Sequence, residues 1–233
     1  MKLYLHQPII ILGGFLIDRA TYKEMIEHIK SRSNNKVVIV PVNKLEWLST
    51  NWSFGWKLIL DKVEKIAKDL SEESITKKVT LIGHSSGGMI LRLFLSDLLF
   101  SNKIYNGKDY VNCLITLGSP NQAKRATYLR NYVSSKLPGS FYRKNVSYIS
   151  VAGELDLRGP IATKTSRRLS KTSYRALNGN DNTIGDGLVP RDCALLIGSK
   201  TIVMKETAHG KSFGKDWYGS KNKVEEWLNR LIE

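Results

Sequence analysis

The chain has 233 residues, of which 42% are hydrophobic, and a formal net charge of +15 at pH 7. This length and apolar content predict one globular α/β domain spanning residues 1–233. No apolar stretch approaches the length of about 20 residues that a membrane-spanning helix needs. With only Cys113 and Cys193, the chain has neither a disulfide framework nor a cysteine cluster for a metal.

Strand-like and helix-like segments alternate along the chain. Apolar runs without strict alternation are typical of strands buried on both faces. They lie at 8–14, 36–42, 78–83, 111–118, 146–153 and 200–205. Helical spacing of apolar residues predicts helices at 19–31, 55–70, 89–100 and 220–233. This order predicts a mostly parallel, doubly wound sheet with helices on both faces.

Two connections, 119–145 and 154–199, are longer than plain loops. Long connections in a compact enzyme usually have a function, so we expect segments 119–145 and 154–183 to form a small cap. Residues 121–145 and 157–175 each carry six Lys or Arg side chains and no Asp or Glu. This charge is typical first of a solvated surface in a chain rich in Lys and Asn, and the functional alternative is attraction to an anionic membrane surface or an anionic substrate. Nucleic acid is not expected, because no nucleic-acid-binding motif accompanies the charge.

The apolar run at 9–12 lies close enough to the N-terminus to be compared with a signal peptide. The run is short, Pro8 precedes it, and no small-residue cleavage site follows. The same residues are needed as a core strand. We therefore expect a cytoplasmic protein, with contact to a membrane only at its surface.

A G-x-S-x-G sequence at 83–87 follows the strand at 78–83 and precedes the helix at 89–100. In this context it predicts a nucleophile elbow, a sharp turn that holds Ser85 at the tip of the sheet. The glycines at both ends are needed because the turn leaves no room for larger side chains.

A serine nucleophile needs a base, and the chain has four histidines. His209 follows the strand at 200–205, at the edge of the sheet where α/β active sites form, and is predicted to be that base. His6 precedes the first core strand, and His28 is expected on the surface of a helix. His84 is expected to pack or to form a hydrogen bond beneath the elbow.

The base needs an acid to orient it, and two positions fit the chain order Ser, Asp, His. Asp186 lies between two glycines, which allow a tight turn, and is the favoured acid. A solvated turn aspartate is the structural alternative there. Asp156, with Glu154 close by, follows the strand at 146–153 and stays open as the other position.

The oxyanion of the reaction needs two backbone N–H donors. Ser86 follows the nucleophile and is predicted to supply one. The glycine-containing loop after the first strand is predicted to supply the other from Phe15, with Gly14 and Leu16 contacting the substrate.

Together these residues resemble the lipase branch of the α/β-hydrolase superfamily over nearly the whole chain. The resemblance rests on four motifs in the expected order: GHSSGG at 83–88, TLGSP at 116–120, GDGLVP at 185–190 and AHG at 208–210. Lipase-like relatives carry a similar DG-x-VP turn whose Asp is the triad acid, which supports Asp186.

The segment WYGS at 217–220 is similar to lipase-like hydrolases of cyanobacteria and plastids. One departure is that Gly13 and Gly14 stand where many lipases have His-Gly. The change removes a supporting hydrogen bond but no oxyanion donor, so it affects the substrate expected and not the class.

These observations predict a serine carboxylic ester hydrolase that acts on lipid acyl esters through an acyl-enzyme. No metal or organic cofactor is expected. Acyl transfer and thioester hydrolysis on the same triad are the enzymatic alternatives. A non-catalytic, basic protein at the membrane surface is the alternative from another class.

Overall fold

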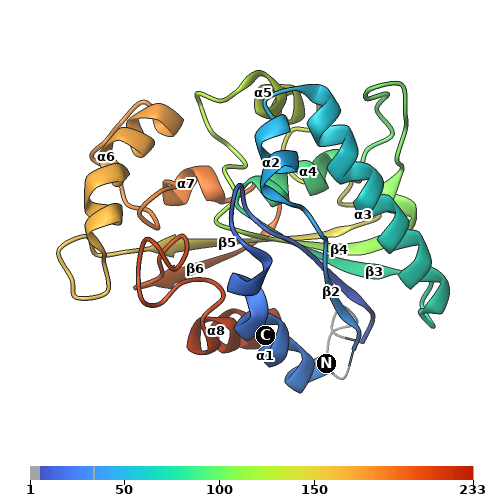
Figure 1. The fold of residues 1–233 in the computed structure, drawn as a ribbon, viewed down its shortest axis with the longest axis horizontal. Coiled ribbons are helices and arrows are strands. Elements are labelled where there is room, and N and C mark those ends of the chain that lie inside the picture. The colour runs from blue at the N-terminus through green and yellow to red at the C-terminus, as the bar shows by residue number, and fades with distance from the viewer. Residues whose placement is uncertain (1–5, 34, 233) are drawn as a thin grey trace.

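The computed structural model describes residues 6–33 and 35–232. Its centre is a sheet of six strands in the order β2-β1-β3-β4-β5-β6, and every pair is parallel (Figure 1). The strands are β1 (Ile9–Leu12), β2 (Val37–Ile39), β3 (Val79–His84), β4 (Val111–Leu117), β5 (Ser147–Glu154) and β6 (Lys200–Lys205). Each predicted strand is present, and the predicted α/β-hydrolase type of sheet is confirmed.

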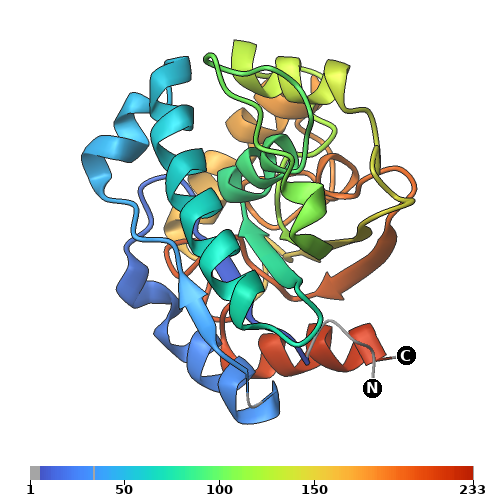
Figure 2. The same cartoon turned by 90° about the vertical axis from the view of Figure 1, so that its right-hand side faces the viewer.

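Helices cover both faces of the sheet (Figures 1 and 2). Two helices lie on one face: α1 (Lys23–Ser33) and α8 (Lys221–Ile232). Four lie on the other: α2 (Lys44–Ser49), α3 (Ser53–Glu73), α4 (Ser86–Phe94) and α5 (Tyr128–Lys136). The remaining two, α6 (Lys164–Asn178) and α7 (Arg191–Ala194), lie beside the β5 and β6 edge. Short 3-10 turns occur at Arg19–Tyr22 and Gly107–Asp109.

The environment of β1 shows why the sequences of these strands are continuous apolar runs. Ile10 and Leu12 belong to the core under α3 and α4, whereas Ile9 and Ile11 belong to the core under α1 and α8. Both sets are fully buried. A parallel strand covered on both faces has no solvent side, so it carries no polar alternation.

The chain order reverses between β1 and β3, the second and third strands of the sheet. It proceeds from β1 outward to β2 and then returns to the other side of β1 as β3. Such a reversal opens a crevice at the carboxyl ends of the two strands, where ligands of open α/β sheets bind. The elbow follows β3, and the predicted oxyanion loop follows β1.

The predicted helix at 89–100 is wrong over its last residues, because α4 ends at Phe94. Ser96 donates its hydroxyl to the carbonyl of Leu93, and its own carbonyl accepts the N–H of Asn106. Phe100 then pairs with Lys103 in an antiparallel bridge. The apolar sequence continues, but a side-chain hydrogen bond and a bridge replace the helical ladder.

Two other expectations need correction. The helix expected at 19–31 begins as a 3-10 turn capped by Asp18, and α1 continues to Ser33. His28, expected on the surface, is half-buried, and its Nε2 has no hydrogen-bond partner within the described chain.

Two of the expectations concern residues at the ends of the chain. Residues 1–5, where a signal peptide would begin, and residue 233, the last of the expected C-terminal helix, lie outside the described residues. In the part of the chain that is described, no helix combines the length and apolar character needed to cross a membrane.

Candidate active site

Ser85 lies between β3 and α4 in a strained backbone conformation. Its φ of 53° and ψ of −124° fall outside the regions that residues with a side chain normally occupy. Its N–H donates to the carbonyl of Leu117 at 2.9 Å, and its carbonyl accepts the N–H of Gly88 at 3.1 Å. These two bonds hold the strained residue between sheet and helix, as a functional site requires.

Close packing explains the two glycines of the elbow. A Cβ on Gly83 would lie 2.4 Å from the Cα of Gly88. A Cβ on Gly87 would lie 2.4 Å from the carbonyl oxygen of Leu12. Both distances are far below van der Waals contact, so α4 can start over the ends of β1 and β3 only with glycine at these positions.

The structure brings Ser85, His209 and Asp186 together from three separate segments. The Ser85 Oγ lies 2.9 Å from the His209 Nε2, and the His209 Nδ1 lies 2.9 Å from the Asp186 Oδ2. Ser85 is 8% exposed, His209 2% and Asp186 0%. A hydroxyl, an imidazole and a carboxylate in this chain can generate a nucleophile and return its proton to a leaving group.

The Asp186 carboxylate is held by several donors. Oδ1 accepts the N–H groups of Leu188 at 3.0 Å and Val189 at 2.7 Å. Oδ2 accepts the hydroxyl of Tyr218 at 2.9 Å in addition to His209. Burial and the Asp186 charge raise the pKa of Tyr218 well above its ordinary value, so the hydroxyl stays a donor. The carboxylate is therefore fixed in position toward the histidine.

The other two acidic positions lie elsewhere. Asp156 is exposed, and its Oδ1 accepts the N–H of Arg158 at 2.9 Å. Glu154 forms an ion pair with Arg191 at 2.7 Å. Of the three acids considered, Asp186 is the one in contact with His209.

His84 lies beneath the elbow and connects two loops of the site. Its Nε2 lies 2.8 Å from the carbonyl oxygen of His209, which can only accept, so Nε2 carries the proton. The Tyr22 hydroxyl then donates to the His84 Nδ1 at 2.7 Å and accepts the N–H of Gly14 at 2.7 Å. Burial, and next the nearby His209, hold the pKa of His84 well below its ordinary value. A neutral imidazole thus joins the loop after β1 to the loop of His209.

The loop after β1 passes directly beside the nucleophile. A Cβ on Gly14 would lie 3.1 Å from the Cβ of Ser85. Leu16 turns the loop with a φ of 57°. The N–H of Gly14 is engaged by Tyr22, whereas the N–H groups of Phe15 and Ser86 donate to no group in the described chain. These two amides are therefore available as hydrogen-bond donors beside the nucleophile.

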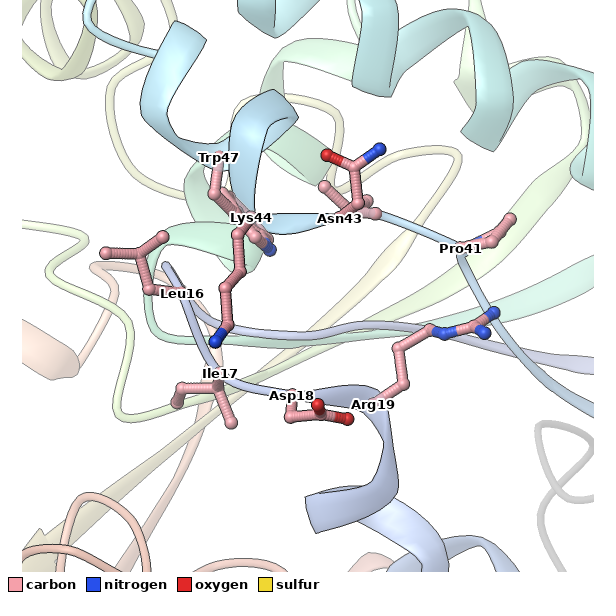
Figure 3. A pocket seen from close by; sticks show the side chains of 9 residues that line it. Leu16, Ile17, Asp18, Arg19, Pro41, Asn43, Lys44 and Trp47 are labelled. Atoms are coloured by element: carbon pink, nitrogen blue, oxygen red, sulfur yellow. The ribbon is translucent and has the colours of Figure 1, made fainter.

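Trp47 lines two hollows near the elbow and the loop after β1. The smaller, of about 180 Å³, adjoins the elbow and is lined by Phe15, Trp47, Thr50, Asn51, Trp56, Ser86, Ile90, Thr127 and Arg130. The larger, of about 470 Å³, lies between the loops after β1 and β2 and contains Leu16 (Figure 3). Figure 3 shows Lys44 reaching across it toward Ile17. The smaller hollow contains both Phe15 and Ser86, so it is the one next to the nucleophile.

Three residues of the site were missed by the sequence analysis. Tyr22 and Tyr218 act through their hydroxyls, and Arg130 lines the smaller hollow. A buried tyrosine needs a partner for its hydroxyl, but the sequence does not indicate which tyrosines are buried. The run at 121–145, which has basic residues and no acids, was the available signal for Arg130. No cluster of His, Cys, Asp or Glu suited to a metal occurs among residues 6–33 and 35–232.

Comparison with known proteins gives a family and a fold. The sequence profile of the palmitoyl protein thioesterase family matches residues 8–154, more than half of the chain. A GPI inositol-deacylase of Kluyveromyces lactis is 34% identical over 95 residues. That match covers 36% of this chain and 9% of the relative, so the chain spans about a tenth of that protein's length.

Solved structures of α/β hydrolases share the fold over nearly the whole chain. Est1E of Butyrivibrio proteoclasticus with bound ferulic acid has a TM-score of 0.55 and 13% identity, covering 97% of this chain and 89% of the other. MGS-MChE2, from a sediment metagenome, has a TM-score of 0.52 and 16% identity, with 97% and 89% covered. A hydrolase of Thermoplasma acidophilum has a TM-score of 0.51 and 12% identity, with 100% and 87% covered.

Proposed function

The chain belongs to the palmitoyl protein thioesterase family and is an α/β hydrolase that acts on ester bonds; from this premise we propose that Ser85, His209 and Asp186 are its catalytic triad. We further propose that residues 1–233 form a single domain and that the substrate is an acyl ester of a lipid. The observation that carries the proposal is the hydrogen-bond chain from Ser85 Oγ through His209 to Asp186.

In the proposed mechanism, the Ser85 Oγ attacks the ester carbonyl carbon while the His209 Nε2 takes the hydroxyl proton. The carbonyl oxygen becomes an oxyanion, which accepts hydrogen bonds from the free N–H groups of Phe15 and Ser86. Such donors each lower the barrier by about 3 kcal/mol. As the tetrahedral intermediate collapses, the proton on His209 passes to the leaving alkoxide.

Water completes the cycle by the same route. His209 takes a proton from the water as it attacks the acyl-enzyme, and then returns a proton to Ser85 as the acid leaves. Asp186 accepts the Nδ1–H throughout, which holds the tautomer and stabilises the imidazolium that forms. Gly14 and Leu16 belong to the loop that would flank the bound substrate.

Thioester hydrolysis is the second candidate, favoured by the family to which the chain belongs. The same triad would cleave either bond, because both intermediates are acyl-serines. A matched pair separates them: hexanoyl esters of a thiol and of the corresponding alcohol, with kcat/KM measured for each. The wild type should hydrolyse one or both, and Ser85→Ala should hydrolyse neither at a rate above background. Equal rates for the wild type and Ser85→Ala would contradict the assignment of Ser85 as the nucleophile.

Acyl transfer is tested in the same assay by adding glycerol and analysing the products. Hydrolysis yields the free acid, whereas transfer yields a new ester. The non-catalytic alternative requires a folded wild-type chain that turns over none of these substrates.

We also propose that the enzyme approaches its substrate at a lipid surface. Large apolar side chains project into solvent from α2 and the start of α3: Leu45, Leu48, Trp52 and Phe54, which we call the apolar rim. Between and next to them in the sequence are Trp47, Thr50, Asn51 and Trp56, which line the smaller hollow. α5, with its basic segment, lies at the same end of the molecule (Figure 2). Aromatic side chains next to lysines and arginines suit the surface of an anionic bilayer.

Vesicle co-sedimentation tests this contact. We expect more wild-type protein to pellet with vesicles containing phosphatidylserine than with phosphatidylcholine alone. The double substitution Trp52→Ala with Phe54→Ala should reduce pelleting, whereas Ile75→Ala, which removes an exposed isoleucine outside the rim, should not. Equal pelleting with both vesicle types would contradict the proposed contact with an anionic lipid surface.

A further inference from the structure

The hollow beside Ser86 contains a cation that no acidic group among the described residues neutralises. Arg130 lies in the first turn of α5 and is only half-exposed. Its Nη2 donates to the Oγ of Ser86 at 3.1 Å, and no carboxylate of the described chain forms an ion pair with it. Ser86 follows the nucleophile directly, so this guanidinium contacts the residue next to Ser85.

A comparison with Arg92 shows that this arrangement is unusual within the molecule. Arg92 is also buried, but its guanidinium donates to the carbonyl oxygens of Asn121 at 3.0 Å and Leu137 at 2.5 Å. Those bonds tie α4 to the segment after β4, which is a structural role. A guanidinium has five N–H donors, and the acceptor that the described part of the chain supplies to Arg130 is the hydroxyl of Ser86.

The surroundings make an unpaired charge costly. Phe15, Trp47, Trp56 and Ile90 form the apolar part of the same hollow, and its polar part, Thr50, Asn51, Ser86 and Thr127, is neutral and contains no carboxylate. Burial lowers the pKa of Arg130, which indicates that its charge is partly removed from water. A partly buried cation without a counterion costs free energy unless an anion binds to it.

We infer that the smaller hollow is an anion subsite of the substrate pocket, in which Arg130 binds a phosphate or carboxylate carried by the ester. This inference rests on the proposed function and narrows its substrate class from acyl esters to anionic ones. A guanidinium suits this task because it can bind two oxygens of such a group in parallel. The apolar side of the hollow, formed by Phe15, Trp47, Trp56 and Ile90, limits the water around this contact and so strengthens it.

Two matched pairs of esters test the subsite. In the first pair the charge is on the alcohol: hexanoylglycerol against hexanoylglycerol phosphate. In the second it is on the acyl chain: the glycerol ester of hexanoic acid against the glycerol half-ester of adipic acid. We expect kcat/KM to favour the anionic member by about tenfold or more in one pair, which also identifies the group and its side of the ester.

Three variants assign the preference to one side chain. Arg130→Met should lower kcat/KM for the preferred anionic ester by about tenfold or more and change that of its neutral partner by less than about threefold. Arg130→Lys, which keeps the positive charge but not the paired N–H donors of the guanidinium, should retain part of the preference for the anionic ester. Arg125→Met, which removes an exposed arginine of the same segment, should retain all of it.

A binding measurement separates this inference from the proposed function. Calorimetry with Ser85→Ala should detect tighter binding of the anionic member of the preferred pair, and adding Arg130→Met should abolish the difference. Two results would contradict the subsite and not the triad. One is good turnover of neutral esters with no preference for anionic ones, and the other is an equal loss of kcat/KM for the anionic and the neutral ester in Arg130→Met. Anion binding that depends on Arg130 without any turnover would support the subsite and overturn the triad.

Discussion

At the scale of single residues, the site depends on polar groups whose hydrogen bonds are nearly all made inside the protein. Asp186 accepts four hydrogen bonds, from two backbone amides, Tyr218 and His209. A carboxylate has about four acceptor positions, so little freedom remains for it to turn. His84 is fixed in the same way by Tyr22 and by the carbonyl of His209. Asp186 therefore orients the imidazole of His209, while His84 holds the backbone of the same residue.

Replacing Tyr218 with phenylalanine tests the first of these supports. The change removes a donor to Asp186 and leaves the buried N–H of Gly153, which Tyr218 accepts at 2.7 Å, without a partner. We expect a loss of about 1–3 kcal/mol of unfolding free energy and a drop in kcat of about tenfold. Tyr128→Phe, on an exposed side chain, is the matched control for both measurements. Unchanged kcat and stability in Tyr218→Phe would contradict this role.

The neutral state of His84 gives a pH dependence with a definite sign. Its pKa in the folded protein lies well below the value of about 6.5 in an unfolded chain. Below pH 6.5 the unfolded state therefore binds more protons, so stability is present above this pH and is lost as the pH falls toward the folded pKa. His84 should contribute at most about 1.4 kcal/mol per pH unit of this loss.

Nitrogen NMR of the imidazole and urea unfolding between pH 7 and about pH 5.5 measure this effect. We expect His84 to stay neutral with its proton on Nε2, and His84→Gln to unfold with a weaker pH dependence than the wild type. His6→Gln, an exposed histidine, should leave the pH dependence unchanged. A His84 signal that titrates near pH 6.5 would contradict the assignment.

At the scale of elements, the position of α4 decides the geometry of the site. The helix begins at Ser86, directly over the ends of β1 and β3, because glycines allow backbone to touch backbone there. The G-x-S-x-G sequence between a strand and a helix was sufficient to predict this turn. It did not predict where α4 ends, because apolar residues continue through Phe100. The end depends on hydrogen bonds of Ser96, which hydrophobic spacing does not reveal.

Substitution of Gly87 by alanine tests the close approach. The new Cβ would lie 2.4 Å from the carbonyl oxygen of Leu12 and 2.5 Å from that of Gly13, so α4 must shift outward. We expect a loss of about 1–3 kcal/mol of unfolding free energy, measured by urea titration, together with loss of hydrolysis. Gly210→Ala is the control for stability, because nothing lies within 4 Å of its Cβ position. Equal stability of the two variants would contradict the packing described.

At the scale of the whole molecule, the sequence was most informative where local patterns coincide with the fold. The six strands and the positions of Ser85 and His209 follow from apolar runs and from glycines at turns, and Asp186 was favoured there while Asp156 stayed open. The order of the strands, with its switch between β1 and β3, was not predicted. The short α2, and α5 and α6 within the long connections, were not predicted. A capping box at Asn43 and Glu46 was the available signal for α2. Tyr22, Tyr218 and Arg130 depend on contacts between distant segments, which single-sequence patterns do not encode.

The distribution of charge predicts how the whole molecule responds to salt. The net charge of +15 includes two basic segments without acids, and one of them contains α5. Surface attraction of this kind is screened over about 8 Å at physiological ionic strength. Binding to vesicles containing phosphatidylserine should therefore weaken as sodium chloride is raised, whereas hydrolysis of a neutral, water-soluble ester should change little. Vesicle binding that is insensitive to salt would contradict an electrostatic contribution.

Active-site labelling tests the central claim most directly. A fluorophosphonate probe reacts with a serine that a neighbouring base activates, and peptide mass spectrometry then locates the modified residue. We predict a single modification, on Ser85, that is absent in Ser85→Ala and slowed by orders of magnitude in His209→Ala. Modification of a different serine, or no modification of the folded wild-type protein, would contradict the account.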